Sequence, residues 1–222
     1  SRDGTIPSQL ALMALASAAR PAFSYLTCVA CAALPQPTFD FKECRIPKGY
    51  RQAMQDVRAS YWTEAIDREW AGILANDTMQ FIPRSQMPPS ANLMNSHYVF
   101  DLKTRADGSI DKFKARLVAD GNTQKFGVDF DQVFATVVKL ATIRMILTLA
   151  AARDYGLWQL DVRQAFLQAT LTEDLYMRMP PNVSSRNAQG EEMVCKLRKT
   201  LYGLKQAARE WSTRLTSELV AL

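Results

Sequence analysis

The sequence predicts an α+β fold with one main domain, built from an antiparallel hairpin and packed helices. Apolar residues recur at helical spacing in the segments 62–76, 140–153 and 204–219. Apolar and charged residues alternate through 97–119, on both sides of an Asp-Gly pair. The 222 residues are 48% hydrophobic and 22% charged. This composition excludes a fully disordered tail, a collagen-like fibre and a coiled coil.

Residues 1–49 differ from the rest of the chain, and we interpret them as an unassigned apolar leader followed by a linker. The leader is rich in Ala and Leu, but Arg20 and Pro21 divide it into pieces shorter than a membrane span requires. A signal peptide or anchor stays open as the less favoured reading. Three prolines mark the linker, Pro35, Pro37 and Pro47, so we expect the folded domain at 50–222.

The first predicted helix runs from Trp62 to Asn76, where the asparagine is a plausible stop. Its apolar residues recur every three or four positions and are expected to bury one face. These residues are Trp62, Ala65, Ile66, Trp70, Ile73 and Leu74. A proline-rich loop from Pro83 to Ser90 follows.

A hairpin is predicted from His97 to Ala119, with its turn at Asp107-Gly108. Side chains alternate across a strand. Three cations of the second strand, Lys112, Lys114 and Arg116, therefore share one face. The other face carries Asp111, Phe113, Ala115 and Leu117 and is mostly apolar. Like charges repel, so the cationic face indicates either a bound anion or a solvated surface, and spacing alone does not decide between them.

The remaining elements alternate between helix and strand. An apolar helix over 140–153 is expected to end at Gly156, and a short strand over 158–161 to end at Asp161. A turn at 165–167 precedes strands at 176–179 and 193–197. A C-terminal helix is expected to bury one face, formed by Leu204, Ala208, Trp211, Leu215 and Leu219.

The charge is basic and unevenly distributed. The net charge is +5 at pH 7, and the window 193–214 holds six cations and a single anion, Glu210. Because these cations surround a glycine turn that leads into a helix, they favour a phosphate-bearing partner. An ordinary basic helix end is the competing interpretation.

The cysteines and the single histidine argue against a zinc site. Cys28 and Cys31 form a lone C-x-x-C pair, whereas Cys44 and Cys195 stand apart, and His97 has no second histidine. We therefore expect reduced, intracellular thiols with structural roles.

Five motifs in order resemble one family, the copia-type retrotransposon reverse transcriptases. The hairpin segment 98–119 resembles the family's fingers hairpin, and the segments 127–139 and 141–144 continue the similarity. Gln159-Leu-Asp-Val-Arg-Gln-Ala-Phe-Leu167 resembles the first palm motif. The segments 175–180 and 194–207 follow in the family's order. The resemblance covers about residues 50–222 and implies a partial right-hand polymerase with fingers and an incomplete palm.

The resemblance also implies roles for particular residues. Asp161 would be the catalytic carboxylate and, with the carbonyl of Val162, would hold Mg²⁺ or Mn²⁺. Lys114 and Arg116 would lie over the triphosphate, and Phe166 under the sugar. The nucleotide side would be completed by Tyr202, Gly203 and Lys205. Further nucleic-acid contacts are expected from Lys112, Lys196, Arg198, Lys199 and Arg209.

Two of these residues have ordinary alternatives. Asp161 could cap a short helix, and Phe166 could be a core residue. The implied partners are an RNA template, a DNA primer, dNTPs and the rest of the Pol polyprotein. No membrane partner is expected, and the resemblance implies an intracellular location, in cytoplasmic particles and the nucleus.

The chain contains no adjacent pair of aspartates, although the family's third palm motif carries one. Two metal ions need more than one carboxylate. We therefore expect this polypeptide to be inactive by itself. A non-catalytic nucleic-acid-binding remnant and a functionless pseudogene product are the alternatives.

Overall fold

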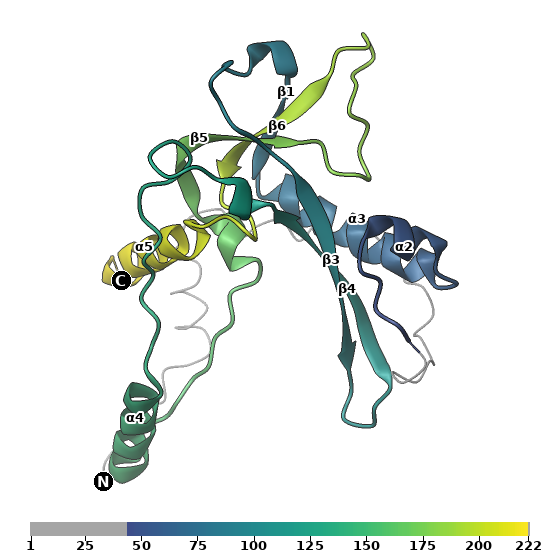
Figure 1. The fold of residues 1–222 in the computed structure, drawn as a ribbon. Helices are drawn as coiled ribbons and strands as arrows, with labels where there is room; N and C mark the ends of the chain where they lie inside the picture. Colours follow the sequence, from purple (N-terminus) through teal and green to yellow (C-terminus); the bar gives the residue numbers. More distant parts are fainter. Residues whose placement is uncertain (1–43, 222) are drawn as a thin grey trace. The chain divides into compact units, whose positions relative to one another are not determined.

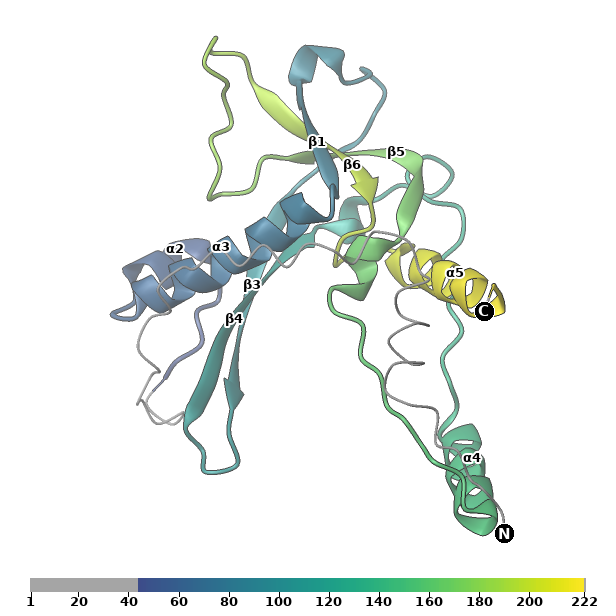
Figure 2. The ribbon, with the colours of Figure 1, turned by 180° about the vertical axis from the view of Figure 1, so that it is seen from behind.

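The computed structural model describes residues 44–221, which form an α+β fold (Figures 1 and 2). The helices are α2 (Tyr50–Gln55), α3 (Ala59–Ala75), α4 (Leu140–Arg153) and α5 (Ala207–Val220). The strands are β1 (Met79–Pro83), β2 (Leu93–Met94), β3 (Ser96–Thr104), β4 (Ile110–Ala119), β5 (Thr170–Arg178) and β6 (Met193–Lys199). Short 3-10 helices are η2 (Arg84–Gln86), η3 (Gly121–Thr123) and η4 (Ala165–Gln168). The predicted fold class is confirmed.

β3 and β4 form the expected antiparallel hairpin. Asp107 shapes its turn by accepting hydrogen bonds from the backbone N–H and the hydroxyl of Ser109. Gly108 follows with a φ of 84°, a conformation that favours glycine. The register shifts between Lys103 and Thr104, so β4 carries a bulge near its start. The bulge buries Ile110 and exposes Asp111, so the prediction that Asp111 shares the apolar face was wrong.

α3 packs against β4 through aromatic side chains. The Trp62 ring meets Phe113 edge-on at 4.6 Å between centroids and Phe100 at 5.2 Å. Trp62, Ala65, Ile66 and Ile73 are buried as predicted, and Trp70 stacks on Phe81. Leu74 is the exception, because it lies 45% exposed at the edge of this face. The predicted stop is confirmed, since Asn76 is the C-terminal cap of the helix.

The other sheet has four strands in the order β1-β6-β5-β2. β1–β6 and β6–β5 pair in antiparallel fashion, whereas the two residues of β2 pair in parallel with β5. β5 and β6 were predicted, and both are longer than expected. β1 and β2 were not predicted. β1 ends at Pro83, where the proline-rich loop had been expected to begin, and β2 is too short to show an alternating pattern.

The segment from α4 to Asp161 departs from prediction in two ways. α4 has the predicted bounds. Its C-terminal cap, however, is Asp154, whose φ of 53° is left-handed, and not Gly156. Residues 158–161 form no strand, and Trp158 is 78% exposed. A strand needs hydrogen-bonding partners on a neighbouring strand, and none of the described strands pairs with this segment.

The predicted apolar face of α5 is buried only near its start. Ala207 is buried and Trp211 is half-buried, but Leu215 and Leu219 are exposed. Ala208 is also exposed. The prediction was wrong for the second half of the helix, because among residues 44–221 no side chain covers that face closely enough to exclude water.

Two of the four cysteines can be described. Cys44 and Cys195 are free thiols, and both are buried. Burial raises the pKa of Cys195 to about 12, so this thiol stays protonated and unreactive. The Cys28–Cys31 pair, the apolar leader and the first prolines lie outside the described residues. No helix within 44–221 has the length and apolar character needed to cross a membrane.

Candidate nucleotide site

Three residues predicted to bind the nucleotide converge between β4, η4 and the turn after β6. The rings of Phe166 and Tyr202 meet edge-on, with their centroids 5.4 Å apart. The guanidinium carbon of Arg116 lies 5.8 Å from the centroid of the Tyr202 ring. Burial raises the pKa of Tyr202, and the Glu69 carboxylate raises it further while Arg116 opposes the change. The phenol is therefore neutral at physiological pH, and a flat aromatic surface lies beside a fixed positive charge.

The backbone of the 202–203 turn closes directly onto the end of β4. The N–H of Ala119 donates to the carbonyl of Tyr202 over 2.8 Å, and Val118 forms a parallel bridge with Tyr202. Gly203 has a φ of 89°, and a Cβ there would collide with the carbonyl oxygen of Ala119. Only glycine fits this approach, so Gly203 shapes the site through its missing side chain.

The cationic face of β4 is present as predicted. Phe113, Ala115 and Leu117 are buried, while Lys114 and Arg116 on the opposite side are only half-buried. Burial lowers the pKa of Lys114, and the neighbouring charges of Arg116 and Lys103 lower it further. The pKa of Lys112 is also lowered, first by burial and then by neighbouring positive charges. These charges belong to Arg68, Lys103 and Arg163. An anion placed on this face would relieve the repulsion between these cations.

A partly buried acid, Glu69 on α3, lies behind this face and was missed by the sequence reasoning. Burial raises its pKa, and hydrogen bonds from the Leu117 backbone and the Gln164 side chain offset part of that rise. The charges of Arg116 and Lys114 act in the same direction as these hydrogen bonds. The signal was present in the sequence, since Glu69 lies at helical spacing from Trp62, Ile66 and Ile73 on the apolar face.

Asp161 and Val162 lie in an exposed, irregular segment before η4. Asp161 does not cap η4, whose N-terminal cap is Gln164, so that alternative is wrong. Phe166 is half-buried and packs against the main core, so the core alternative holds for it in part.

The residues present do not make a complete metal site. Within 44–221, no three Asp, Glu, His or Cys side chains come together in a way that could hold a metal ion. Mg²⁺ prefers several oxygen ligands, so Asp161 and one carbonyl do not suffice.

Lys205 contacts a different part of the chain from Arg116. Its ammonium lies 4.5 Å from the centroid of the Phe130 ring, and its backbone N–H donates to Gln124 over 2.9 Å. Arg116, Phe166 and Tyr202 form one cluster, which we call the Arg116 cluster. Of the three residues predicted after β6, Tyr202 and Gly203 therefore lie at this cluster, whereas Lys205 packs on the 124–130 segment.

Comparison with known proteins shows the family of this chain. The family model described as reverse transcriptase (RNA-dependent DNA polymerase) matches residues 82–222. The chain belongs to the reverse transcriptase family. The match covers the described fold from the end of β1 onward and includes Arg116, Phe166 and Tyr202.

Three similar proteins are retrotransposon polyproteins from plants. The retrovirus-related Pol polyprotein from transposon RE2 of Arabidopsis thaliana is 39% identical over 176 residues, or 79% of this chain. The Pol polyprotein from transposon RE1 of the same plant is 39% identical over 78% of the chain. The Pol polyprotein from transposon TNT 1-94 of Nicotiana tabacum is 38% identical over 78% of the chain. The matched regions span only 12–13% of these relatives' lengths. No solved structure matches significantly. The predicted copia-type resemblance is confirmed.

Two of the three basic residues of β6 in this reverse transcriptase chain are paired with acids. Lys196 forms an ion pair with Asp174 at 2.7 Å, and Arg198 with Asp77 at 2.7 Å. Burial lowers the pKa of Lys199, and the charge of Arg214 adds to the effect. The basic window that the sequence showed is therefore partly neutralised by acids from outside it.

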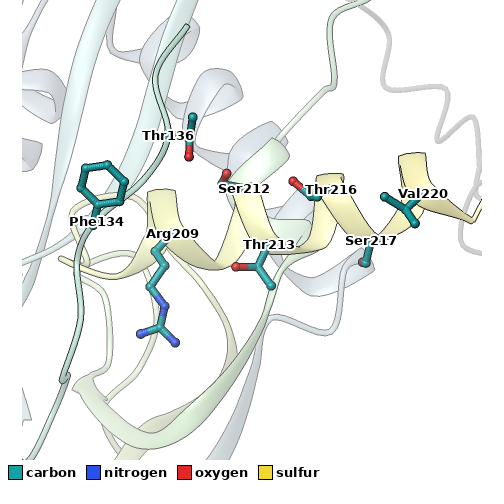
Figure 3. Close-up of a pocket in the computed structure, with 8 residues that line it drawn as sticks. All are labelled: Phe134, Thr136, Arg209, Ser212, Thr213, Thr216, Ser217 and Val220. Atoms are coloured by element: carbon teal, nitrogen blue, oxygen red, sulfur yellow. The ribbon is translucent and has the colours of Figure 1, made fainter.

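Arg209, the last residue predicted to contact nucleic acid, lines a groove of about 480 Å³ along α5 (Figure 3). Its guanidinium lies 3.3 Å from Glu210 and donates to the carbonyl of Gln132 over 3.4 Å. The groove is rich in hydroxyl groups, and its lining consists of Phe134, Thr136, Arg209, Ser212, Thr213, Thr216, Ser217 and Val220. Of these hydroxyl-bearing residues, Thr136 lies within a reverse transcriptase motif of the sequence, the segment 127–139, whereas the four on α5 lie outside the motifs.

Proposed function

We propose that residues 50–222 are the fingers and part of the palm of a reverse transcriptase from a copia-like retrotransposon Pol polyprotein. The parent protein would catalyse RNA-directed DNA synthesis from dNTPs on an RNA template and a DNA primer. The observation that carries this proposal is the convergence of Arg116, Tyr202 and Phe166, because it joins a positive charge to aromatic surfaces beside the cationic face of β4.

Each residue has a role suited to its chemistry. Lys114 and Arg116 would hold the triphosphate, since guanidinium and ammonium groups bind phosphate oxygens. Phe166 would lie under the sugar, with Tyr202, Gly203 and Lys205 along the nucleotide side. Asp161 and the carbonyl of Val162 would be this chain's share of a Mg²⁺ or Mn²⁺ site that other carboxylates complete.

Nucleotide binding is the direct test of the site. We expect Arg116→Ala to weaken binding of dTTP with MgCl₂ at least about tenfold by titration calorimetry, because a charge-assisted contact is lost. Arg178→Ala is the matched control, since Arg178 is an exposed arginine of β5 whose nearest acid is Glu192. Equal affinity in the wild type and in Arg116→Ala would contradict the proposal.

We also propose that the 222-residue chain does not polymerise by itself, since it has no Asp-Asp pair. Primer extension on poly(rA) with oligo(dT) and either Mg²⁺ or Mn²⁺ should give no incorporation above the Asp161→Ala variant. Incorporation above that background would overturn this part of the proposal. The location implied by the family, in cytoplasmic particles and the nucleus, is likewise a proposal, as is assembly within a polyprotein.

The second candidate function is a non-catalytic nucleic-acid-binding remnant. The cationic face of β4 favours it: burial lowers the pKa of Lys112 and Lys114, and neighbouring cations lower it further. Binding to a DNA–RNA duplex without any dTTP binding, and with an affinity that falls steeply as salt rises, would support it. A functionless pseudogene product would bind neither the duplex nor dTTP. Absence of the peptide from expressed protein would support that alternative.

A further inference from the structure

Gln164 occupies an unusual position just before Phe166. It caps η4 with a φ of 51°, in the left-handed region that non-glycine residues seldom adopt. Such a conformation is strained and persists where the surroundings enforce it. The contacts of the Gln164 side chain therefore decide how the segment from Asp161 to Phe166 is held.

The amide of Gln164 lies against α3 and its C-terminal cap. Asn76 donates from its Nδ2 to the Oε1 of Gln164 over 3.2 Å. The Gln164 side chain also lies close enough to Glu69 to lower the pKa of its carboxyl, against the rise that burial causes. Gln168 then donates to the Oδ1 of Asn76 over 2.9 Å, so both ends of η4 are tied to the same asparagine.

Gly72 makes room for this amide. A Cβ at Gly72 would overlap Nε2, Oε1 and Cδ of Gln164, so the side chain rests directly on the helix backbone. The colliding atoms are the far end of a flexible side chain. An alanine at this position would therefore displace the amide without requiring the helix to move.

We propose that Gln164 is a positioning residue of the nucleotide site. Its amide, seated on Gly72 between Glu69 and Asn76, fixes the segment that carries Asp161 and places Phe166 against Tyr202. The inference rests on the function proposed above and adds to it the contact that connects α3 to the nucleotide site. Gln164 itself touches neither Arg116 nor the Tyr202 ring in the contacts described, so it acts through Phe166.

Gly72→Ala separates this role from general stability. Alanine favours a helix more than glycine does, so the melting temperature should not fall. The N–H of Leu167 donates to the Gln164 carbonyl over 2.8 Å and reports on the segment. We expect its hydrogen exchange to accelerate at least about tenfold. Gly156→Ala is the matched control, because nothing lies within 4 Å of a Cβ there.

A reciprocal exchange of side chains tests the contact itself. Gln164→Glu places a carboxylate against Glu69, so exchange at Leu167 should accelerate at pH 8 and less at pH 5. Adding Glu69→Gln restores a donor opposite the new carboxylate, and Asn76 can still donate to it. We expect the double variant to return to within about threefold of the wild-type exchange rate.

Binding of dTTP with MgCl₂ distinguishes positioning from a purely structural role. We expect Gly72→Ala and Gln164→Glu to weaken it at least about fivefold, with recovery in the double variant. Unchanged exchange at Leu167 in Gly72→Ala, or no recovery in the double variant, overturns the contact. Faster exchange with unchanged dTTP affinity overturns the positioning role. A wild-type chain that binds no dTTP contradicts the proposed function instead, and the exchange data still decide whether Gln164 holds the segment.

Discussion

Two regions of this reverse transcriptase chain differ sharply in packing. In the region formed by α3, the hairpin and the four-stranded sheet, large side chains are buried, and Trp62 is only 1% exposed. In the segment 131–162 nearly every residue is exposed, and Trp158 is 78% exposed. The residues of the Arg116 cluster belong to the first region and Asp161 to the second. The fold therefore shapes the proposed nucleotide-facing surface, whereas the proposed metal ligand, Asp161, lies in a segment whose side chains are mostly exposed.

The sharpest way to test this contrast is to truncate one tryptophan in each region. Trp62→Ala should destabilise the chain by about 3–5 kcal/mol, because it removes a buried ring packed on Phe100 and Phe113. Trp158→Ala should change stability by no more than about 0.5 kcal/mol. Urea unfolding followed by far-ultraviolet circular dichroism measures both. Similar losses in the two variants would show that the regions pack alike.

A smaller effect is expected at the glycine turn that supports Tyr202. Gly203→Ala should cost about 2–4 kcal/mol, because the new Cβ meets the Ala119 carbonyl and the φ of 89° disfavours a side chain. Gly108→Ala in the hairpin turn is the control. It shares a positive φ but has open space around its Cβ, so about 1 kcal/mol is expected. Chemical denaturation gives the difference, and equal costs would remove the argument for close approach at Gly203.

The partly buried Glu69 predicts a pH dependence within the packed region. Because burial raises its pKa above 4.5, the native state favours the protonated carboxyl. The contribution of Glu69 to the free energy of unfolding is fully present below pH 4.5 and is lost as the pH rises through the raised pKa. Glu69→Gln should remove this loss, so the stability of the variant relative to the wild type should increase with pH across that window. Thermal unfolding from pH 4 to pH 8 measures it. A relative stability that stays constant with pH would contradict the burial of this charge.

The smallest effect is expected on the outer surface of β6. Lys196→Ala removes an ion pair with Asp174, whose side chain is 69% exposed. The Asp174 hydrogen bond raises the pKa of Lys196, yet water and salt screen the pair. We expect a loss of about 0.5 kcal/mol or less in denaturant unfolding. A loss above about 1.5 kcal/mol would mean that this surface is less exposed to solvent than the structure indicates.

Periodicity and alternation predicted two helices and the hairpin, although α4 buries only Ala150. The bounds of α4 and the core of α3 followed from apolar spacing, and the hairpin followed from alternation around Asp107-Gly108. The prediction that Asp111 lies on the apolar face was wrong because a bulge adds one residue to the strand, and alternation cannot reveal a bulge. The predicted strand at 158–161 failed because its pattern describes side chains, whereas a strand also needs a partner backbone.

The candidate site was predictable where a motif carries the chemistry. Arg116, Phe166 and Tyr202 came from the family resemblance, and the structure brings them together. Glu69 and Gln164 were missed, because each acts through contacts with distant segments. The partners of Lys196 and Arg198 were missed for the same reason, since Asp174 and Asp77 lie outside the basic window.

The bond between the Ala119 amide and the Tyr202 carbonyl has a consequence for biosynthesis. A ribosome makes β4 long before it reaches Tyr202, so a nascent chain carries a hairpin whose end is still unpaired. That strand end can complete its bonding only when the glycine turn emerges and reaches back across the intervening helices. Assembly of the proposed nucleotide-facing surface therefore waits until the glycine turn has been synthesised.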